Sequence, residues 1–279
     1  MIKHLEVTTL VENTASGRGL LGEHGLAFLV EADGRRVLFD SGQGQVLASN
    51  AERLGVSLAG LDAVVLSHGH YDHTGGLPAV LERSPGARLF LHPAALEPKF
   101  NRHGQEIGAG LPEARTLADM AAELVWTQGP TEIVPGLFVT GQIPRRNDYE
   151  DTGGPFFRDA DCREEDRIPD DQALYARTEE GVVVILGCGH AGVVNTLEQV
   201  RELTGEPRVH ALVGGMHLLR AGPERLERTA EALERFDVQV IGPNHCTGID
   251  AICRFRQRFA ERVIQMRVGD VLEIGEVRA

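Results

Sequence analysis

The sequence predicts an α/β protein in which two β-sheets pack face to face between outer helices, a four-layer αββα sandwich. Three observations favour this fold. Strand-like and helix-like segments alternate in both halves of the chain, short apolar runs typical of buried strands recur, and 42% of the 279 residues are hydrophobic. We therefore expect one domain over residues 1–279, with a loop insertion around 144–171.

The first half begins as a β-meander. Strands are expected at 4–11, 25–31 and 35–39, and Asp33-Gly34 is a strong hairpin signal between the last two. A helix, a strand, a helix and a strand follow at 44–54, 63–66, 76–83 and 88–91.

The middle of the chain contains two segments with little periodicity. We expect irregular structure at 93–130 and a long surface loop from Pro144 to Asp171, which is rich in charged residues, glycine and proline. Alternation then resumes, with strands expected at 137–141, 173–178, 181–186, 209–213 and 238–241, helices at 193–203, 223–235 and 249–260, and final strands thereafter.

Composition restricts the class of partner. Asp and Glu number 41 against 28 Lys and Arg, a net charge of −13 that argues against a nucleic-acid binder and fits a small-molecule substrate. The sequence shows no apolar run of about 20 residues and no signal-peptide core, so we expect a cytoplasmic protein without a membrane partner. The four cysteines show no CxxC spacing and are expected to be reduced. The composition leaves the oligomeric state open.

The strongest chemical signal is the segment His68-Gly69-His70-Tyr71-Asp72-His73, which follows the apolar run 63–66. Imidazole and carboxylate groups are typical zinc ligands. Because residues two apart in an extended chain face the same side, His68 and His70 can share one ion, while Asp72 and His73 face a second. The segment predicts a site for one or two metal ions, most simply zinc, with iron or manganese as alternatives.

This HxHxDH pattern at the end of a strand resembles the signature of the metallo-β-lactamase superfamily. Within that superfamily the chain is most similar to the branch of dihydropterin-ribofuranosylaminobenzene phosphate synthases. The matching blocks lie at 11–14, 23–26, 38–42, 66–77, 187–192, 214–218 and 245–248. The resemblance implies the αββα metallo-β-lactamase fold and two sets of metal ligands. These are His68, His70 and His190 around one ion, and Asp72, His73 and His245 around the other.

The positions of the two distant histidines support this assignment. His190 follows the apolar run 182–186 and His245 follows 238–241, so each lies where a buried strand ends. A lone histidine at such a place is more often structural. Beside an HxHxDH segment, the ligand interpretation is preferred.

The chain departs from the superfamily pattern in lacking the Gly-Asp that usually supplies a bridging carboxylate after the penultimate strand. Cys188-Gly189-His190 stands there instead. Either His190 takes the bridging side, or Asp171 or His217 enters the metal shell, or the second ion is held weakly. Cys188 and Cys246 are interpreted as small buried residues, although thiolates bind zinc well.

Several other residues have two interpretations. His217 is either an acid or base facing the substrate or a structural residue, and Asp40 either orients a ligand histidine or caps a turn. His24 lies either at the cleft rim or in an exposed turn. Basic side chains in the irregular regions either neutralise a phosphate or are solvated; they are Lys99, Arg102, His103, Arg145 and Arg146.

These residues predict a hydrolase in which zinc-bound hydroxide attacks a small phosphorylated or ester-type substrate, with Asp72 orienting the attacking oxygen. The branch resemblance implies an alternative, the condensing activity of a dihydropterin-ribofuranosylaminobenzene 5′-phosphate synthase. A third hypothesis is a non-catalytic, metal-binding regulatory protein.

Overall fold

Two β-sheets occupy the centre of a computed structural model of the chain, which describes residues 1–275. The strands of the first sheet are β1 (His4–Val11), β2 (Ala27–Ala32), β3 (Arg35–Phe39), β4 (Ala63–Val65), β5 (Arg88–Leu91), β7 (Glu123–Trp126) and β15 (Val271–Gly275). Those of the second are β8 (Thr131–Val134), β9 (Leu137–Val139), β11 (Ala173–Thr178), β12 (Gly181–Leu186), β13 (Val209–Gly215) and β14 (Val240–Asn244). The strand orders are β15-β1-β2-β3-β4-β5-β7 and β14-β13-β12-β11-β9-β8.

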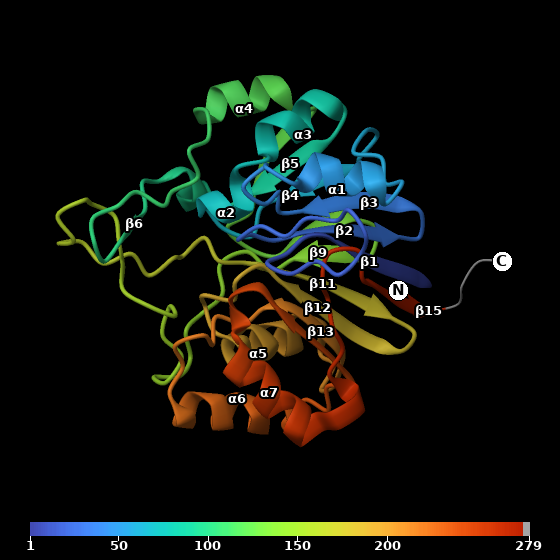
Figure 1. Cartoon of the computed structure of the whole chain (residues 1–279), viewed down its shortest axis with the longest axis vertical. Helices are drawn as coiled ribbons and strands as arrows, with labels where there is room; N and C mark the ends of the chain where they lie inside the picture. The colour runs from blue at the N-terminus through green and yellow to red at the C-terminus, as the bar shows by residue number, and fades with distance from the viewer. Residues whose placement is uncertain (276–279) are drawn as a thin grey trace.

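Helices cover the outer face of each sheet. They are α1 (Leu47–Arg53), α2 (Tyr71–Thr74), α3 (Leu77–Arg83), α4 (Ala114–Met120), α5 (Val193–Thr204), α6 (Pro223–Arg235) and α7 (Ile249–Phe259), with short 3-10 turns at η1 (Pro93–Leu96), η2 (His245–Thr247) and η3 (Ala260–Arg262). In Figure 1, α1, α3 and α4 lie above the sheets and α5, α6 and α7 below them. The predicted αββα sandwich is confirmed.

Alternating side chains along the strands build three apolar layers. Phe28 and Val30 of β2 face the second sheet and pack in one cluster with Val183 and Ile185 of β12. Leu29, between them, faces the opposite way and belongs to the layer under α1 and α3. A third layer joins the outer face of the second sheet to α5, α6 and α7.

The predicted hairpin between β2 and β3 is present. Asp33 and Gly34 both have positive φ, at 49° and 84°, as a two-residue type I′ turn requires. Ala32 pairs with Arg35 across the turn, and this register places the inward-facing side chains of β2 opposite those of β3.

Parallel pairing carries several strand ends to one edge of the molecule. β3, β4, β5 and β7 are parallel to one another, and so are β12, β13 and β14. Polar residues that follow the carboxyl ends of β4, β12, β13 and β14 therefore collect at that edge, where α/β sheets usually bind ligands.

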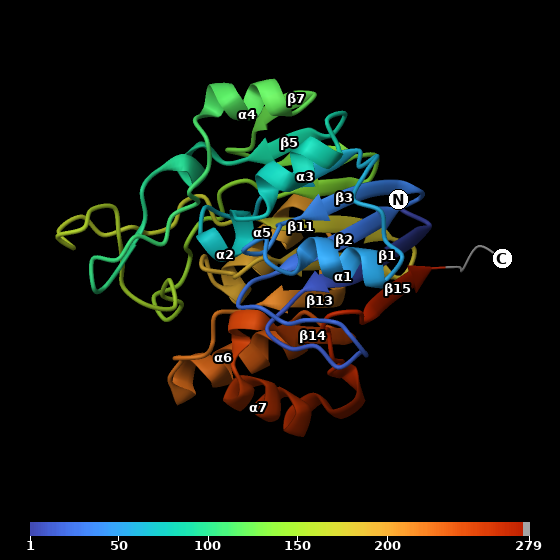
Figure 2. The ribbon, with the colours of Figure 1, turned by 45° about the horizontal axis from the view of Figure 1, so that its top comes forward.

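Two expectations need correction or refinement. Residues 93–130 are not uniformly irregular, because they contain η1, α4 and β7; β7 is an edge strand whose partial exposure hides its periodicity. The segment 144–171 is largely loop but holds β10 (Phe156–Phe157), which pairs with β6 (Phe100–Asn101). These two loop regions extend together from the end of the sheets near α2 (Figures 1 and 2). No helix within residues 1–275 is long and apolar enough to cross a membrane.

Candidate metal centre

The histidine loop begins where β4 ends. His68 and His70 are extended residues before α2, and His68 Nε2 lies 2.9 Å from His70 Nδ1. Asp72 and His73 lie on α2 itself. All four side chains are buried although they are polar, so each must be satisfied by a partner.

Three further histidines approach this loop from the second sheet. His190 follows β12, His217 follows β13 and His245 follows β14. Ring centroids lie 4.8 Å apart for His68 and His190, and 5.1 Å apart for His73 and His245. The His217 ring lies 4.3 Å from that of His190. The structure thus brings every histidine singled out as a ligand or acid–base candidate into one cluster.

A buried carboxylate fixes the tautomer of two of these rings. Asp40 Oδ2 accepts hydrogen bonds from His73 Nδ1 and from Ser67 Oγ, both at 2.7 Å. Because the Ser67 hydroxyl proton is donated to Asp40, its oxygen accepts from His68 Nδ1 at 2.8 Å. Nδ1 therefore carries the donated hydrogen in His68 and His73. Asp40 therefore orients a histidine, in agreement with the first of its two interpretations, rather than only capping a turn.

Two more rings are held through Nδ1 in the same way. His190 Nδ1 donates to the carbonyl of Thr152 at 2.7 Å. His245 Nδ1 lies 2.9 Å from Asn13 Oδ1, an oxygen that also accepts from the backbone N–H of Gly25. Since an amide oxygen only accepts, His245 also donates from Nδ1.

As a result, four Nε2 atoms face the centre of the cluster: those of His68, His73, His190 and His245. In neutral rings each carries an unshared electron pair, and the Nε2 atoms of His73 and His245 are only 3.3 Å apart. Burial lowers the pKa of His68 and of His190 well below the usual value, which keeps these two rings neutral. Within residues 1–275, Nε2 of His190 has no hydrogen-bond partner. A metal cation bound at the centre would satisfy these electron pairs together.

The acidic groups of the site favour such a cation. Asp72 Oδ2 lies 3.4 Å from His245 Nε2 and 3.8 Å from His73 Nε2. Burial opposes ionisation of Asp72, but the charge of His73 and contacts with His245 lower its pKa overall. Burial also lowers the pKa of His73, yet the Asp40 and Asp72 carboxylates outweigh this and raise it. The two carboxylates therefore favour a positive charge at this position.

The separations between these atoms fit tetrahedral zinc. Two nitrogen ligands of one such ion lie about 3.3 Å apart, given Zn–N distances of about 2.0–2.1 Å. The pair formed by His73 and His245 has this separation, and the contact between His68 and His70 is 2.9 Å. The residues present therefore fit the metal that the sequence predicts.

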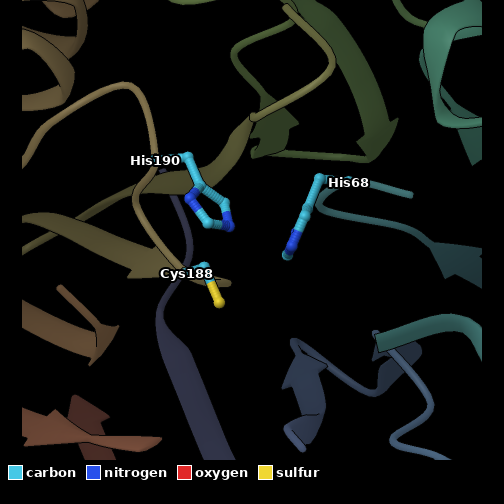
Figure 3. A group of neighbouring side chains, drawn as sticks. All are labelled: His68, Cys188 and His190. Atoms are coloured by element: carbon cyan, nitrogen blue, oxygen red, sulfur yellow. The ribbon is translucent and has the colours of Figure 1, made fainter. Parts of the chain in front are cut away.

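Sequence reasoning missed the position of Cys188. Its Sγ is 3.1 Å from His73 Nε2 and lies within 4.8 Å of ligand atoms of His68, His190 and His245. Figure 3 shows Cys188 and His190, on the segment after β12, close to His68 on the segment after β4. The only signal in the sequence was the place of Cys188, where a bridging carboxylate usually stands. Interpretation as a small buried residue does not account for these contacts.

Backbone strain is concentrated at the site. Asp40, His217 and His245 have φ values of 61°, 45° and 49°, a region that non-glycine residues rarely adopt. Close packing also restricts the chain before Cys188, because a Cβ on Gly187 would lie 2.1 Å from Ser67 Oγ. The fold thus holds these side chains in place at an energetic cost, as expected of a functional site.

Asp171 and His217 are the other candidates to replace the missing bridging carboxylate. Asp171 Oδ2 accepts from the backbone N–H of Ala191 at 2.7 Å, and in the described chain its Oδ1 has no partner. Burial raises the pKa of Asp171 to about 7. His217 faces the cavity, and burial lowers its pKa to about 3, so its ring is neutral. Its Nδ1 also has no partner in that same range.

The basic residues of the loops separate into two groups. Lys99 does not face the cleft: it is buried and pairs with Asp166 and Asp170, at 3.1 and 2.8 Å. Asp170 also accepts from the backbone N–H of Gly69 at 2.7 Å, so this cluster supports the histidine loop.

Arg145 and Arg146 are also structural. Arg145 donates to the carbonyl of His190 at 2.7 Å, and Arg146 is bonded to Glu202 of α5. Both interpretations of Lys99 are wrong, because its side chain is neither solvated nor directed at the cleft. The proposed phosphate role lacks support for these two arginines. Arg102 and His103, in contrast, are exposed and line the cleft.

Two adjoining cavities open beside the cluster. The inner one, about 190 Å³, is lined by residues that include His24, His70, Asp72, Phe156, His190 and His217. The outer one, about 360 Å³, shares His24, Phe156, His217 and His245 with it and adds Arg102, His103 and Arg220. His24 Nε2 is 3.3 Å from Asp72 Oδ2, which places His24 at the rim. A small molecule in these cavities would lie beside the candidate metal ligands.

Asp40→Asn tests the orienting carboxylate. The amide would present a donor to Ser67 or His73, so we expect zinc affinity, measured by competition with a chelator, to fall about 10–100-fold. Asp119→Asn, at an exposed position of α4, is the matched control and should leave affinity unchanged. Unchanged affinity in a folded Asp40→Asn variant would contradict this role.

Lys99→Ala tests the support beneath the loop. Removing the ammonium leaves two buried carboxylates unpaired, and we expect the free energy of unfolding in urea to fall by about 3–5 kcal/mol. Arg102→Ala, at a nearby exposed position, should change it by less than about 0.5 kcal/mol. A similarly small change in Lys99→Ala would show that the cluster contributes little.

Comparison with known proteins agrees with this geometry. The chain is 28% identical to the 7,8-dihydropterin-6-methyl-4-(beta-D-ribofuranosyl)-aminobenzene-5'-phosphate synthase of Methanocaldococcus jannaschii, over 98% of this chain and 97% of that protein. It is 31% identical to an uncharacterized protein of the same organism, over 96% and 100% of the two chains. A solved structure of a metal-dependent hydrolase of the beta-lactamase superfamily matches 98% of this chain and 100% of that one, with 32% identity and a TM-score of 0.83. Residues 21–203 match the family described as Metallo-beta-lactamase superfamily. The chain therefore belongs to the metallo-β-lactamase superfamily.

Proposed function

We propose that this protein is a metal-dependent hydrolase of a small phosphorylated or ester-type substrate. The observation that carries the proposal is the convergence of four Nε2 atoms, each freed by an Nδ1 hydrogen bond, beside a cavity open to small molecules. A structural metal site would be closed by its ligands, whereas a catalytic one borders a cavity.

The proposed ligands form two sets: His68, His70 and His190, and Asp72, His73 and His245. Nitrogen donors with one carboxylate favour zinc, with iron or manganese as alternatives. A bound divalent ion of this kind activates water at neutral pH and polarises the oxygen of the attacked group. Two groups of closely spaced ligand atoms, one with His68 and His190 and the other with His73 and His245, support two ions.

Protein side chains would then position the reactants. Asp72 lies at the inner cavity, ionised, where it can orient the attacking oxygen. His217 borders both cavities, so its ring can accept or relay a proton from the substrate side. Phe156 closes the inner cavity against the ring of His70, at a centroid distance of 5.1 Å.

The outer cavity supports an anionic substrate. Arg102, His103 and Arg220 line it, on a chain whose net charge is −13. Three basic side chains at the entrance of an otherwise acidic protein would attract a phosphate group and hold it by charge-assisted hydrogen bonds.

A second candidate is a condensing activity on a pterin-linked, phosphorylated substrate. It is favoured by the likeness to the Methanocaldococcus jannaschii synthase, which extends over nearly the whole of both chains. The same basic entrance would serve it, and the metal ligands would be shared.

Zinc-loaded protein incubated with phosphomonoesters, phosphodiesters, carboxylic esters and thioesters tests the proposal. We expect turnover of at least one class, lost on chelation and restored by zinc, and lost in His190→Ala. Formation of a pterin-linked ribofuranosylaminobenzene phosphate without hydrolysis would favour the second candidate. Bound zinc with no turnover of any kind would favour a non-catalytic, metal-binding regulatory protein.

Arg102→Ala tests the anionic substrate. For a phosphorylated substrate we expect KM to rise about tenfold with little change in kcat, because a charged hydrogen bond is lost from ground state and transition state alike. Arg163→Ala, at an exposed position of the neighbouring loop region 144–171, is the control. An equal KM in both variants would remove Arg102 from substrate binding.

A further inference from the structure

We propose that the Cys188 thiolate is a metal ligand shared by both halves of the centre, standing where the superfamily usually places a carboxylate. The inference concerns the metal centre and rests on the proposed function only in requiring that the histidines hold metal. It identifies what replaces the missing bridging carboxylate, for which the sequence leaves His190, Asp171 and His217 as candidates.

The position of the sulfur carries the proposal. Cys188 Sγ forms one group with His68 and His190, and another with His73 and His245, with ligand atoms in each group within 4.8 Å of one another. Among the described residues, Cys188 is the member common to these two groups. In Figure 3 the Cys188 side chain lies beside the rings of His68 and His190.

The contact with His73 agrees with shared coordination. Sulfur and nitrogen ligands of one tetrahedral zinc ion lie about 3.5 Å apart, given a Zn–S distance of about 2.3 Å. The separation between Cys188 Sγ and His73 Nε2 is 3.1 Å. Without metal, the thiol proton can occupy this contact; on metal binding that proton is released to solvent and the sulfur becomes a thiolate.

The other candidates are less well placed. Asp171 lies in none of the groups of closely spaced ligand atoms found within residues 1–275, and one of its oxygens is engaged by the backbone of Ala191. His217 joins only a group with Cys188 and Cys246. Cys246 Sγ donates a hydrogen bond to the carbonyl of Cys188 at 3.4 Å but belongs to neither of the two groups that contain the paired histidines, so it provides a matched control thiol.

A thiolate changes the metal preference of the centre. Sulfur is a softer ligand than a carboxylate oxygen and favours zinc, cobalt or cadmium over manganese. A centre with five histidines, Asp72 and Cys188 should therefore retain zinc in competition with an excess of manganese.

Cobalt substitution tests the proposal in the full-length protein. Metal-free protein titrated with Co²⁺ should develop a thiolate-to-cobalt charge-transfer absorption. Cys188→Ser should lose this band, and Cys246→Ser should keep it. Cys188→Asp should bind the same number of cobalt ions without the band, because a carboxylate replaces the thiolate. Circular dichroism establishes that each variant is folded.

X-ray absorption of the zinc-loaded wild-type protein gives a measurement independent of any variant, with a sulfur scatterer expected at about 2.3 Å from zinc. Bound metal with only nitrogen and oxygen neighbours would overturn the role of Cys188, as would a band that persists in Cys188→Ser or a failure to bind cobalt. Turnover measured on the same zinc-loaded sample separates the two proposals: hydrolysis without zinc–sulfur bonding refutes only the cysteine ligand, and zinc–sulfur bonding without turnover refutes only the hydrolase.

Discussion

The site depends on the hydrogen bonds that fix one nitrogen of each buried imidazole. Asp40, Ser67, Asn13 and the carbonyl of Thr152 are acceptors that leave no choice of tautomer. Once Nδ1 is committed as a donor, each Nε2 must face the centre with its electron pair exposed. The electron pairs converge beside an ionised carboxylate, Asp72, so the cluster favours a cation.

The layered fold supplies these acceptors from separate segments. Asp40 follows β3, Ser67 follows β4 and Asn13 follows β1, while Thr152 belongs to the long loop before β11. Asp40, Ser67 and Asn13 lie near strand ends of the first sheet, so the inter-sheet core sets their positions. The carboxyl ends of β12 and β14 supply the ligands of the second sheet, and the loops leave the cavity open on one side.

The sequence predicts the parts of this arrangement that are encoded locally. Apolar runs and the Asp33-Gly34 turn predict the sheets, because alternation and turn geometry are properties of neighbouring residues. The spacing of His68, His70 and His73 predicts a metal site for the same reason.

The features that the sequence does not predict depend on contacts between residues far apart in the chain. The burial of Lys99 follows from Asp166 and Asp170, nearly 70 residues away in the chain, and nothing near Lys99 indicates it. Cys188 resembles any small buried residue until the strand ends of both sheets are brought together. The edge strand β7 is half exposed and therefore lacks the pattern of a buried strand.

Anomalous diffraction from zinc-soaked crystals tests the central claim most directly. The account predicts zinc peaks at about 2.0–2.2 Å from Nε2 of His68 and His190, and from Nε2 of His73 and His245. The account would be contradicted by crystals without zinc at this cluster, in which these Nε2 atoms instead donate hydrogen bonds to protein groups.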